Sequence, residues 1–519
     1  MRYLAICAFL LALVVPAATT AQQGTDAASL LALHRAYVGW QFGDGTFTSL
    51  RETGSIVNTK PEPGHTPNSP TPVLTVIRGA AYRTTQIDPE SGRRDDAGFT
   101  GRVFWESNQN GFTHPIIGDP QKFEVSYQLL VMEGTAGLTG MLESPVTIDG
   151  TSYPVVRVSP SAGFPLDLAV NPKTGAYVQA VIDPGGAYEE KLDIVSYAEA
   201  LPGKRIRAVS RVHDSHYTTT YTSFEPNVTI TDDQLHPPPQ TAAWSFADPN
   251  PFSITTHGDQ ILVPATINGV AGTFLFDTGA SDILLTADFA ARAHVRRAES
   301  AMVGGIGGTT SAEADILDSI VVGGNTLWNV YALSAGLGND YRGLLGGGAN
   351  GQRVDGILGY DLMGRAVVKV NMGASTMTIL DPATADFSQE HGILLNLDLN
   401  GGQPAVPMKL DGTIDVNTTL DTGDALGIGY SRELVRKYHL SLLRFPAMIG
   451  GVGGGEFTSC GAFGTLQIGP VTLDAQDEMA CETSALSGND LLVGYDFLKH
   501  FNMIFDYPRG QLILEPLPQ

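Results

Sequence analysis

The chain has 519 residues, which is enough for two or three domains with hydrophobic cores of their own. Hydrophobic residues make up 43% of the chain, and its net charge of −23 is spread without a long acidic run, which excludes a disordered protein. The same negative charge disfavours nucleic acid and anionic lipid surfaces as partners, because both are themselves negatively charged.

Residues 1–21 have the pattern of a secretory signal peptide. Arg2 is followed by an apolar run from Leu4 to Val15 and then by small residues that end at Ala21. The run is too short to span a membrane, and no later segment reaches spanning length. We therefore expect an exported protein, periplasmic or extracellular, without a membrane span.

The next region, 26–240, is predicted to form a β-rich accessory domain. Leu30, Leu33 and Tyr37 fall on one face of an opening helix. Short apolar segments separated by Gly, Pro and Asp follow the helix and predict a strongly curved antiparallel sheet. Its strands are expected near 55–57, 73–77, 101–105, 122–125, 153–158, 167–170, 177–181 and 194–197.

Three short motifs follow the helix of this domain in order. They are Gly-Arg-Val-Phe-Trp at 101–105, Leu-x-Val-Asn-Pro-x-Thr-Gly at 168–175 and Phe-Glu-Pro-Asn at 224–227. This layout is similar to that of lipoprotein-carrier-like half-barrels, which implies a groove for an apolar ligand without assigning its residues. A sheet that only supports or positions the rest of the chain is the alternative, and both interpretations stay open.

A proline-rich stretch beginning at His236 indicates a linker, 241–254, between the accessory domain and the rest of the chain. Two related units follow, 255–385 and 386–519. Each opens with a strand, a tight turn and a second strand, and the turns are Asn268-Gly269 and Asp411-Gly412. The matching layouts predict a duplicated, bilobed and mainly β fold.

Each unit carries Asp-Thr-Gly at the end of its second strand, at 277–279 and again at 421–423. One such tripeptide is weak evidence in a chain with 60 Gly, since an Asx turn after a strand is then the better explanation. Two copies 144 residues apart, each followed by the same two further motifs, indicate a duplication.

The two further motifs recur in the same order. Met-x-Gly-Gly-x-Gly-Gly begins at Met302 and at Met448, and its glycines suit the mobile tip of a hairpin, here called a flap. An apolar pair followed by Gly-Tyr-Asp then ends at Asp361 and at Asp496 and precedes a closing strand.

This ordered set resembles the aspartic peptidases, and the flap sequence is more similar to the retroviral type than to the pepsin type. Retroviral enzymes build their site from two identical chains, so two units in one chain resemble a fused dimer. The resemblance covers about 255–519 and implies a bilobed β-barrel fold, a monomer and two flaps over a peptide or protein substrate. The flap residues it implies are Gly304, Gly305, Ile306, Gly307, Gly450, Gly451, Val452 and Gly453.

The chemistry of amide hydrolysis accounts for the need for two carboxylates. Water must lose a proton as it attacks while the carbonyl oxygen gains one, so an acid and a base must face each other. Asp277 and Asp421, sharing one proton, can serve as both, because close like charges do not ionise together easily. We expect these two residues to be the catalytic pair, with no metal and no cofactor.

The residues next to the pair are expected to hold its loops. Thr278 and Thr422 can hydrogen-bond across the two lobes, and Gly279 and Gly423 allow the backbones to approach closely. Asp424 departs from the family pattern, which places Ala, Ser or Thr there. It either lies near the pair and raises its apparent pKa values, or points to solvent or caps the next turn.

Only two other features of the chain suggest chemistry. Cys460 and Cys481 remain after removal of the signal, and a hairpin turning at Gly469 would bring them face to face, so we expect a disulfide. His213 and His216 would point to opposite faces of a strand without a third ligand, so we expect no metal site.

The leading hypothesis from the sequence is an exported aspartic endopeptidase. The alternative is a non-catalytic binding protein, in which the N-terminal domain holds an apolar ligand or a protein and the peptidase fold is inactive. The presence of both Asp-Thr-Gly motifs favours catalysis.

Overall fold

The computed structural model describes residues 26–518 apart from 59–69, 88–93, 187, 214–216, 257–259, 306–307, 337–352, 400–401, 426, 441–444, 453, 476–478, 484–485 and 487–488. The predicted signal peptide, 1–21, lies outside the described residues. Among the helices that the structure describes, none has both the length and the hydropathy needed to cross a membrane.

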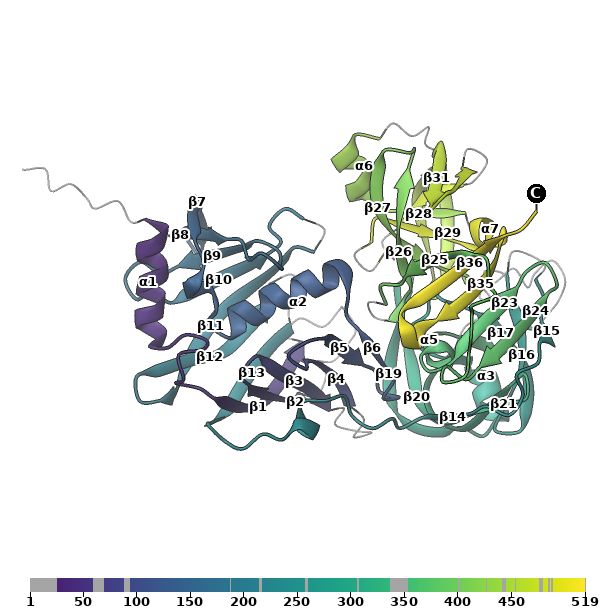
Figure 1. Ribbon diagram of the computed structural model, residues 1–519, viewed down its shortest axis with the longest axis horizontal. Coiled ribbons are helices and arrows are strands. Elements are labelled where there is room, and N and C mark those ends of the chain that lie inside the picture. The colour runs from purple at the N-terminus through teal and green to yellow at the C-terminus, as the bar shows by residue number, and fades with distance from the viewer. Residues whose placement is uncertain are drawn as a thin grey trace, which may run out of the picture.

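One large sheet forms the N-terminal part of the molecule (Figure 1). Thirteen strands of the described region pair in the order β6-β5-β4-β3-β2-β1-β13-β12-β11-β10-β9-β8-β7, and every neighbouring pair is antiparallel. The pairing of β1 with β13 therefore joins the first and last parts of the domain at the middle of the sheet. The strands are β1 (Ser49–Asn58), β2 (Thr71–Arg78), β3 (Ala81–Ile87), β4 (Arg94–Phe99), β5 (Phe104–Ser107), β6 (Thr113–Pro115), β7 (Gly140–Ile148), β8 (Thr151–Val158), β9 (Leu166–Val170), β10 (Tyr177–Ile182), β11 (Glu190–Leu201), β12 (Lys204–Val212) and β13 (Tyr217–Pro226).

The opening helix is confirmed as α1 (Ala27–Val38), but its buried face differs from the predicted one. Asp26 caps it by accepting a hydrogen bond from the Ser29 N–H at 2.7 Å, and Gly39 ends it at φ 80°. The predicted face included Leu33 and Tyr37, which are only partly buried. The buried residues are instead Ala27, Leu30, Leu31, His34 and Val38. His34 is tolerated there because both ring nitrogens have partners, the Gly175 carbonyl oxygen and the Glu133 carboxylate, each at 2.8 Å.

One of the predicted strands is wrong and another is wrong in part. Residues 122–125 lie in helix α2 (Gly118–Val131), which crosses one face of the sheet (Figure 1). Phe123, Tyr127 and Leu130 have helical spacing and pack on the same core, which overrides the short alternation at 122–125. The predicted strand at 101–105 begins only at Phe104, because the chain turns at Gly101 with φ 94°.

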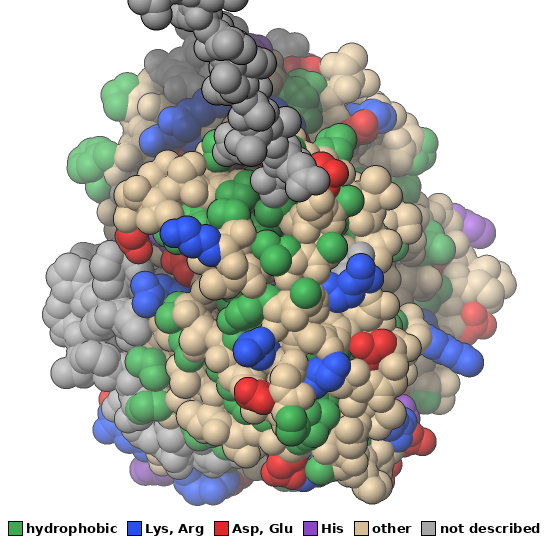
Figure 2. All heavy atoms as spheres, turned by 90° about the vertical axis from the view of Figure 1, so that its left-hand side faces the viewer, with side chains coloured by type: hydrophobic (Ala, Val, Ile, Leu, Met, Phe, Trp, Pro, Cys, Tyr) green, Lys and Arg blue, Asp and Glu red, His purple; other side chains and the backbone are tan. Residues whose placement is uncertain are grey.

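The outer face of the N-terminal domain carries mixed side chains. Figure 2 shows lysine and arginine side chains interspersed with aspartate and glutamate among hydrophobic patches.

Three short 3₁₀ helices lie in connecting segments of the described chain: η1 (Thr135–Gly137), η2 (Asp232–Gln234) and η4 (Tyr507–Arg509).

The rest of the described chain forms two similar β lobes, which confirms the bilobed β fold. Lobe 1 has a sheet of order β14-β21-β18-β22-β17-β16-β20-β19, and lobe 2 has one of order β29-β30-β33-β28-β34-β27-β26-β31-β32. The lobe 1 elements are β14 (Ala243–Ser245), β16 (Leu262–Ile267), β17 (Val270–Phe276), β18 (Leu284–Thr286), α3 (Ala287–Arg292), β19 (Arg296–Gly305), β20 (Gly308–Val322), β21 (Asn325–Ala335), β22 (Gly356–Leu358) and α5 (Tyr360–Met363). The lobe 2 elements are β26 (Ala405–Leu410), β27 (Ile414–Leu420), β28 (Ile428–Tyr430), α6 (Arg432–Tyr438), β29 (Phe445–Gly451), β30 (Gly454–Gly461), β31 (Thr465–Ile468), β32 (Val471–Asp474), β33 (Ala480–Glu482), β34 (Leu491–Val493) and α7 (Tyr495–Leu498).

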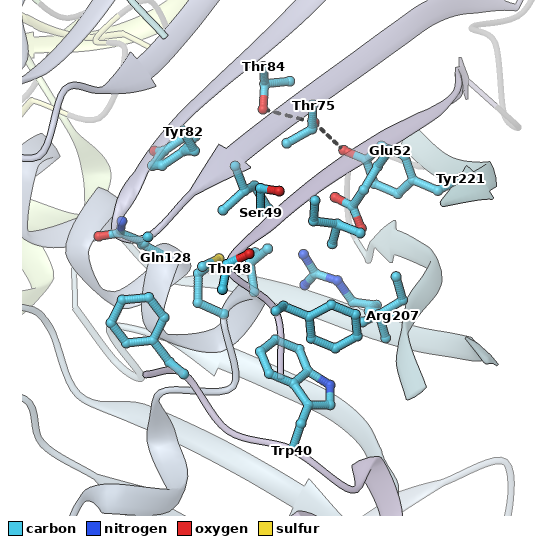
Figure 3. A pocket seen from close by; sticks show the side chains of 18 of the residues that line it. Trp40, Thr48, Ser49, Glu52, Thr75, Tyr82, Thr84, Gln128, Arg207 and Tyr221 are labelled. Carbon is cyan, nitrogen blue, oxygen red and sulfur yellow. Dashed lines mark hydrogen bonds between the residues drawn. The ribbon is translucent and has the colours of Figure 1, made fainter. Parts of the chain in front are cut away.

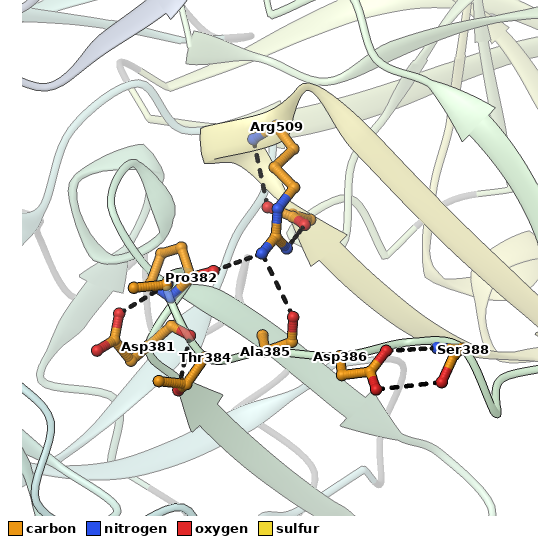
Figure 4. Close-up of polar contacts among 9 residues, drawn as sticks. Asp381, Pro382, Thr384, Ala385, Asp386, Ser388 and Arg509 are labelled. Carbon is orange, nitrogen blue, oxygen red and sulfur yellow. Dashed lines mark hydrogen bonds and ion pairs between the residues drawn. The ribbon is translucent and has the colours of Figure 1, made fainter.

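A third sheet of the second half joins the two lobes. Its order, β15-β24-β23-β35-β36-β25, places the closing strand of lobe 1 beside the closing strand of lobe 2, with Val368 opposite Phe505. Arg509 of lobe 2 also holds the connecting segment, since its guanidinium donates to the Pro382 and Ala385 carbonyl oxygens (Figure 4). The strands are β15 (Phe252–Ser253), β23 (Val367–Asn371), β24 (Thr376–Leu380), β25 (Ile393–Asn396), β35 (Phe501–Asp506) and β36 (Gln511–Pro516).

The short-range predictions in the lobes are largely confirmed. Asn268 and Gly269 form a two-residue turn with φ of 49° and 83°, as the steric demands of such hairpins require. The equivalent turn in lobe 2 has one residue more, 411–413. Cys460 lies opposite Cys481 on paired strands and forms the predicted disulfide, with 4.0 Å between the Cα atoms.

Candidate active site

The two Asp-Thr-Gly loops emerge from equivalent strands of the two lobes. β17 leads into Asp277 and runs parallel to β22, and β27 leads into Asp421 and runs parallel to β34. The backbone N–H of Asp277 donates to the Leu358 carbonyl oxygen at 3.1 Å, and that of Asp421 donates to Val493 at 2.9 Å. The apolar pair before each Gly-Tyr-Asp therefore fixes the backbone from which the carboxylate projects.

One oxygen of each carboxylate is held by its own loop. Oδ1 of Asp277 accepts from the Gly279 N–H at 2.8 Å and the Ala280 N–H at 3.0 Å. Oδ1 of Asp421 accepts from the Gly423 N–H at 2.8 Å and the Asp424 N–H at 3.2 Å. The two carboxyl groups also lie within hydrogen-bonding reach of each other.

Each carboxyl group packs on the glycine of the opposite loop. A Cβ atom added to Gly279 would lie 2.4 Å from Cγ of Asp421, and one added to Gly423 would lie 2.2 Å from Cγ of Asp277. No side chain fits at either position without moving a carboxylate. The glycines therefore set how closely the two acids approach.

The threonines cross-link the two loops in a reciprocal way. Thr278 Oγ1 donates to the Leu420 carbonyl oxygen at 2.6 Å, and Thr422 Oγ1 donates to the Phe276 carbonyl oxygen at 2.8 Å. In addition, Thr278 Oγ1 accepts from the Thr422 N–H at 3.0 Å, and Thr422 Oγ1 accepts from the Thr278 N–H at 3.1 Å. Both threonines are fully buried, so these bonds form in a setting where losing one is costly.

Electrostatics favour one shared proton on this pair. Burial raises the pKa of Asp277 well above its ordinary range, and the nearby charge of Asp421 raises it further. Burial also raises the pKa of Asp421, but hydrogen bonds from Asp277 and from the Gly423 N–H oppose that rise. The pair can therefore hold an acid and a base side by side.

Tyr507 is a residue of this site that sequence reasoning missed. It is fully buried, and burial together with the charges of Tyr360, Asp277 and Asp421 raises its pKa well above the ordinary value. Its ring stacks on Tyr360 with 5.7 Å between centroids. The sequence shows only that Tyr507 directly follows the closing strand of lobe 2. That position does not distinguish an ordinary core tyrosine from one that lies near Asp277 and Asp421.

The two flaps meet at their tips. The flap hairpins pair Gly305 with Gly308 and Gly451 with Gly454, while Ile306, Gly307 and Gly453 lie outside the described residues. A Cβ atom added to Gly305 would lie 2.7 Å from Cβ of Val452. Val452 also packs on the lobe 1 cluster that Ala280 contacts, three residues after Asp277. The flap of lobe 2 thus reaches the same cluster of lobe 1 that the Asp277 loop contacts.

A loop of the N-terminal domain, residues 108–112, packs against lobe 1 beside Asp361. Asp361, of the first Gly-Tyr-Asp, is fully buried and accepts hydrogen bonds from Asn108 at 2.8 Å and Asn110 at 2.7 Å. Asn110 also bonds both backbone groups of Tyr331, at 3.0 and 2.8 Å. Phe112, from the same segment, is fully buried in the core of the lobes. This loop is therefore part of the packing of lobe 1.

Asp361 also faces a second acid. Burial and the neighbouring Asp282 raise the pKa of Asp361 to about 8, and burial raises the pKa of Asp282 to about 6. Asp282 lies five residues after Asp277, so this second acid pair is connected to the Asp277 loop through its backbone. In lobe 2 the equivalent residue, Asp496, instead pairs with Lys499.

Two further sequence features concern His213 and His216, where no metal site is expected, and Asp424 beside the second acid. Nδ1 of His213 lies 2.8 Å from Oδ2 of Asp193, and His216 lies outside the described residues. Among the residues that the structure describes, no group of three or more His, Cys, Asp and Glu side chains has a geometry that could hold a metal. The backbone of Asp424 is fixed at both of its polar groups. Its N–H donates to Asp421 Oδ1 at 3.2 Å, and its carbonyl oxygen accepts from the Tyr495 N–H at 2.8 Å.

Comparison with known proteins finds a family similarity within the first of the two lobes. Residues 263–362 match the family model described as Aspartyl protease, and this range contains the first Asp-Thr-Gly, the first flap and the first Gly-Tyr-Asp. The resemblance of this region to aspartic peptidases is thereby confirmed. A solved structure of a DUF1329 family protein from Desulfovibrio piger shares 12% identity, with a TM-score of 0.29, over 40% of this chain and 95% of that chain. No curated protein matches the chain.

The contact between the flaps predicts a cross-link. Replacing Gly305 and Val452 by cysteine should give an intramolecular disulfide in most molecules under mild oxidation, because the two positions touch. Mass spectrometry after thiol alkylation measures it. The control replaces Gly305 and Phe457, whose side chain is 87% exposed on the same lobe 2 hairpin. Equal cross-linking in both variants, or none in the first, would show that the tips do not meet.

The contact with Asn110 predicts a loss of stability. Asn110→Ala removes three hydrogen bonds and leaves Asp361 and the Tyr331 backbone short of partners, so the free energy of unfolding should fall by about 3 kcal/mol. Calorimetric melting measures it. Asn396→Ala, at an exposed position in β25, should change the melting temperature little. If both variants melt alike, the N-terminal loop does not stabilise lobe 1.

Proposed function

We propose that this chain is an exported aspartic endopeptidase, acting as a single bilobed monomer on peptide or protein substrates. The observation that carries the proposal is the reciprocal packing of Asp277 on Gly423 and of Asp421 on Gly279. It brings two acids from different lobes together at a distance where one proton serves both. The family match over residues 263–362 supports the same assignment for the first lobe.

Catalysis follows from the protonation of the pair. Water held between the acids loses a proton to the ionised carboxylate as its oxygen attacks the peptide carbonyl carbon. The protonated carboxyl gives its proton to the carbonyl oxygen, which yields a neutral tetrahedral diol. As the diol collapses and the C–N bond breaks, the protonated carboxyl gives its proton to the leaving nitrogen and a diol hydroxyl gives its proton to the other carboxylate, so the pair again holds one proton. Every proton in this cycle is exchanged with Asp277 or Asp421, so the mechanism calls on no cofactor.

The surroundings of the pair have defined roles in this proposal. Thr278 and Thr422 keep the two loops in register, while the flaps cover an extended peptide and exclude water. Because each lobe supplies one acid and one flap, a single chain forms the whole site. The signal pattern of residues 1–21 and the disulfide support export to the periplasm or outside the cell.

The domain organisation is part of the proposal. We assign 26–240 to the accessory domain, 241–254 to the linker, 255–385 to lobe 1 and 386–519 to lobe 2. The linker includes β14 and β15, which pair with β21 and β24, so it is held against the peptidase lobes. With Phe112 in the core of the lobes as well, the accessory domain stays attached in the active protein.

Incubation with a mixed peptide library tests the function directly. Purified protein is incubated at several pH values with and without a statine-type inhibitor, and the products are identified by mass spectrometry. The proposal expects internal cleavage that the inhibitor abolishes. Absence of cleavage at every pH would favour the alternative, a non-catalytic binding protein that uses the N-terminal domain.

The shared proton predicts the effect of removing either acid. Asp277→Asn and Asp421→Asn should each lower kcat by roughly 10³-fold or more while leaving the melting temperature nearly unchanged, because each acid needs its partner. The control, Asp288→Asn, changes an exposed carboxylate of α3 and should cleave at the wild-type rate. Turnover near the wild-type rate in either of the first two variants would remove that residue from the site.

The position of Asp424 predicts a shift in the pH profile. If its carboxylate lies near the pair, it disfavours the charged form of the pair and raises its apparent pKa values. Replacing it by alanine, the residue at the equivalent position 280, then lowers those values and moves the alkaline limb of kcat/KM to lower pH. An alkaline limb at the wild-type pH would show that Asp424 does not tune the pair.

A further inference from the structure

A pocket lies within the N-terminal domain, far along the chain from the acids. It opens between the face of the large sheet and helix α2, and Figure 3 shows the side chains that line it. The space encloses about 840 Å³ when its opening to solvent is counted. The proposed peptidase mechanism makes no use of it.

Most of the wall of this pocket is apolar. Aromatic and aliphatic side chains come from the segment after α1, from the strands and from α2, and they include Trp40, Phe42, Phe47, Leu50, Ile77 and Met132. Phe42 is 41% exposed, so an apolar surface extends to the mouth. Such a wall suits an alkyl or aryl group, whose burial is favourable by about 25 cal/mol per Å².

Two opposite charges face the pocket from the sheet. Glu52 of β1 is 5% exposed, and Arg207 of β12 contributes its guanidinium (Figure 3). Among the residues that the structure describes, neither side chain has a hydrogen-bond partner, and the two do not form an ion pair with each other. Nη1 of Arg207 is buried without a partner. Guanidinium groups inside proteins are normally paired, so this one has unused capacity for an anion.

The neighbours of these charges are already satisfied. The Tyr221 hydroxyl bonds Thr75 Oγ1 at 2.9 Å, and Thr75 bonds Thr84 at 3.1 Å. The ring of Tyr127 lies 5.5 Å from the Arg207 guanidinium carbon, which holds the cation by a cation–π contact. Arg207 is thus positioned beside the pocket by an aromatic ring that does not neutralise it.

We propose that this pocket binds an amphiphile with an apolar tail and a monoanionic head, whose head pairs with Arg207. The tail would lie along the aromatic wall, and the anion would use the hydrogen-bonding groups of the guanidinium that are free in the described structure. A neutral head of the same length would gain the apolar contacts but not the charge pairing.

Glu52 makes this binding depend on pH. Burial raises the pKa of Glu52 to about 7, although the charge of Arg207 opposes that rise. Below pH 7 the carboxyl is neutral and leaves Arg207 for the ligand, whereas above pH 7 the carboxylate competes for the cation and repels the head. The apparent affinity for an anion should therefore fall about tenfold from pH 6 to pH 8.

Other ionisable groups also face this region. Tyr221 lies beside Glu52 and Tyr127, and burial raises the pKa of Tyr221 beyond the range of the experiment. Glu190 of β11 also feels the charge of Arg207, and burial raises its pKa. Glu124 of α2 accepts a hydrogen bond from Tyr82 at 2.8 Å, and burial raises its pKa to about 7. A variant at Glu52 is therefore needed to assign the pH effect.

The test compares decane-1-sulfonate, whose head stays ionised at every pH used, with decan-1-ol as an uncharged probe. Calorimetric titration of the full chain should show that the sulfonate binds about tenfold more tightly at pH 6 than at pH 8, while decanol binds equally at both. Arg207→Met should weaken sulfonate binding at least tenfold and leave decanol binding unchanged. Arg211→Met, an exposed change on the same strand, is the matched control and should bind like the wild type.

Glu52→Gln separates the pH effect from the other acids and does not depend on the folding of the Arg207 variant. It should bind the sulfonate at pH 8 as tightly as the wild type does at pH 6. Equal binding of sulfonate and decanol, or wild-type sulfonate affinity in a folded Arg207→Met variant, would overturn the anion site. A tenfold pH dependence that persists in Glu52→Gln would overturn the role of Glu52. These measurements do not involve peptide cleavage, so they stand apart from the peptidase proposal.

Discussion

The approach of two buried carboxyl groups, each resting on a glycine of the other lobe, is the constraint on which the two-lobed half of the molecule depends. Like charges at this range are unfavourable in a buried setting unless a proton is shared and the loops cannot separate. The threonine bonds hold the loops, and the shared six-stranded sheet holds the lobes. Neither lobe forms the pair alone, which is why the whole pattern occurs twice in one chain.

The duplication is not symmetric, and the difference lies where the N-terminal domain attaches. Asp361 and Asp496 occupy equivalent positions in the two lobes. Asp496 pairs with Lys499, whereas Asp361 is buried beneath Asn108 and Asn110. A buried acid without partners is costly, so lobe 1 relies on the N-terminal loop in a way that lobe 2 does not. The N-terminal domain is thus built into the support of the Asp277 loop.

The features predicted well from the sequence were local or repeated. The Asn268-Gly269 turn and the facing cysteines follow from short-range sterics and strand register, and the two Asp-Thr-Gly motifs validate each other by repetition. The strand expected at 122–125 was wrong because four residues of alternation do not distinguish a strand from one side of a helix. The bonds of Asn110 to Asp361, 251 residues apart, left no signal, since asparagine is common in loops for reasons of turn geometry alone. Glu52 and Arg207 were missed because nothing local in the sequence shows that β1 and β12 bring them to one pocket.

Carboxyl ¹³C NMR of protein labelled at aspartate measures the shared proton most directly, with the signals of Asp277 and Asp421 assigned by replacing each with asparagine. We expect two separated titration steps for the pair, the upper one well above the ordinary value of about 4. We also expect that Asp277 titrates at a lower pH once Asp421 is replaced, because a neighbouring charge is removed. Two independent titrations near pH 4, each unaffected by replacement of the other residue, would contradict the shared proton.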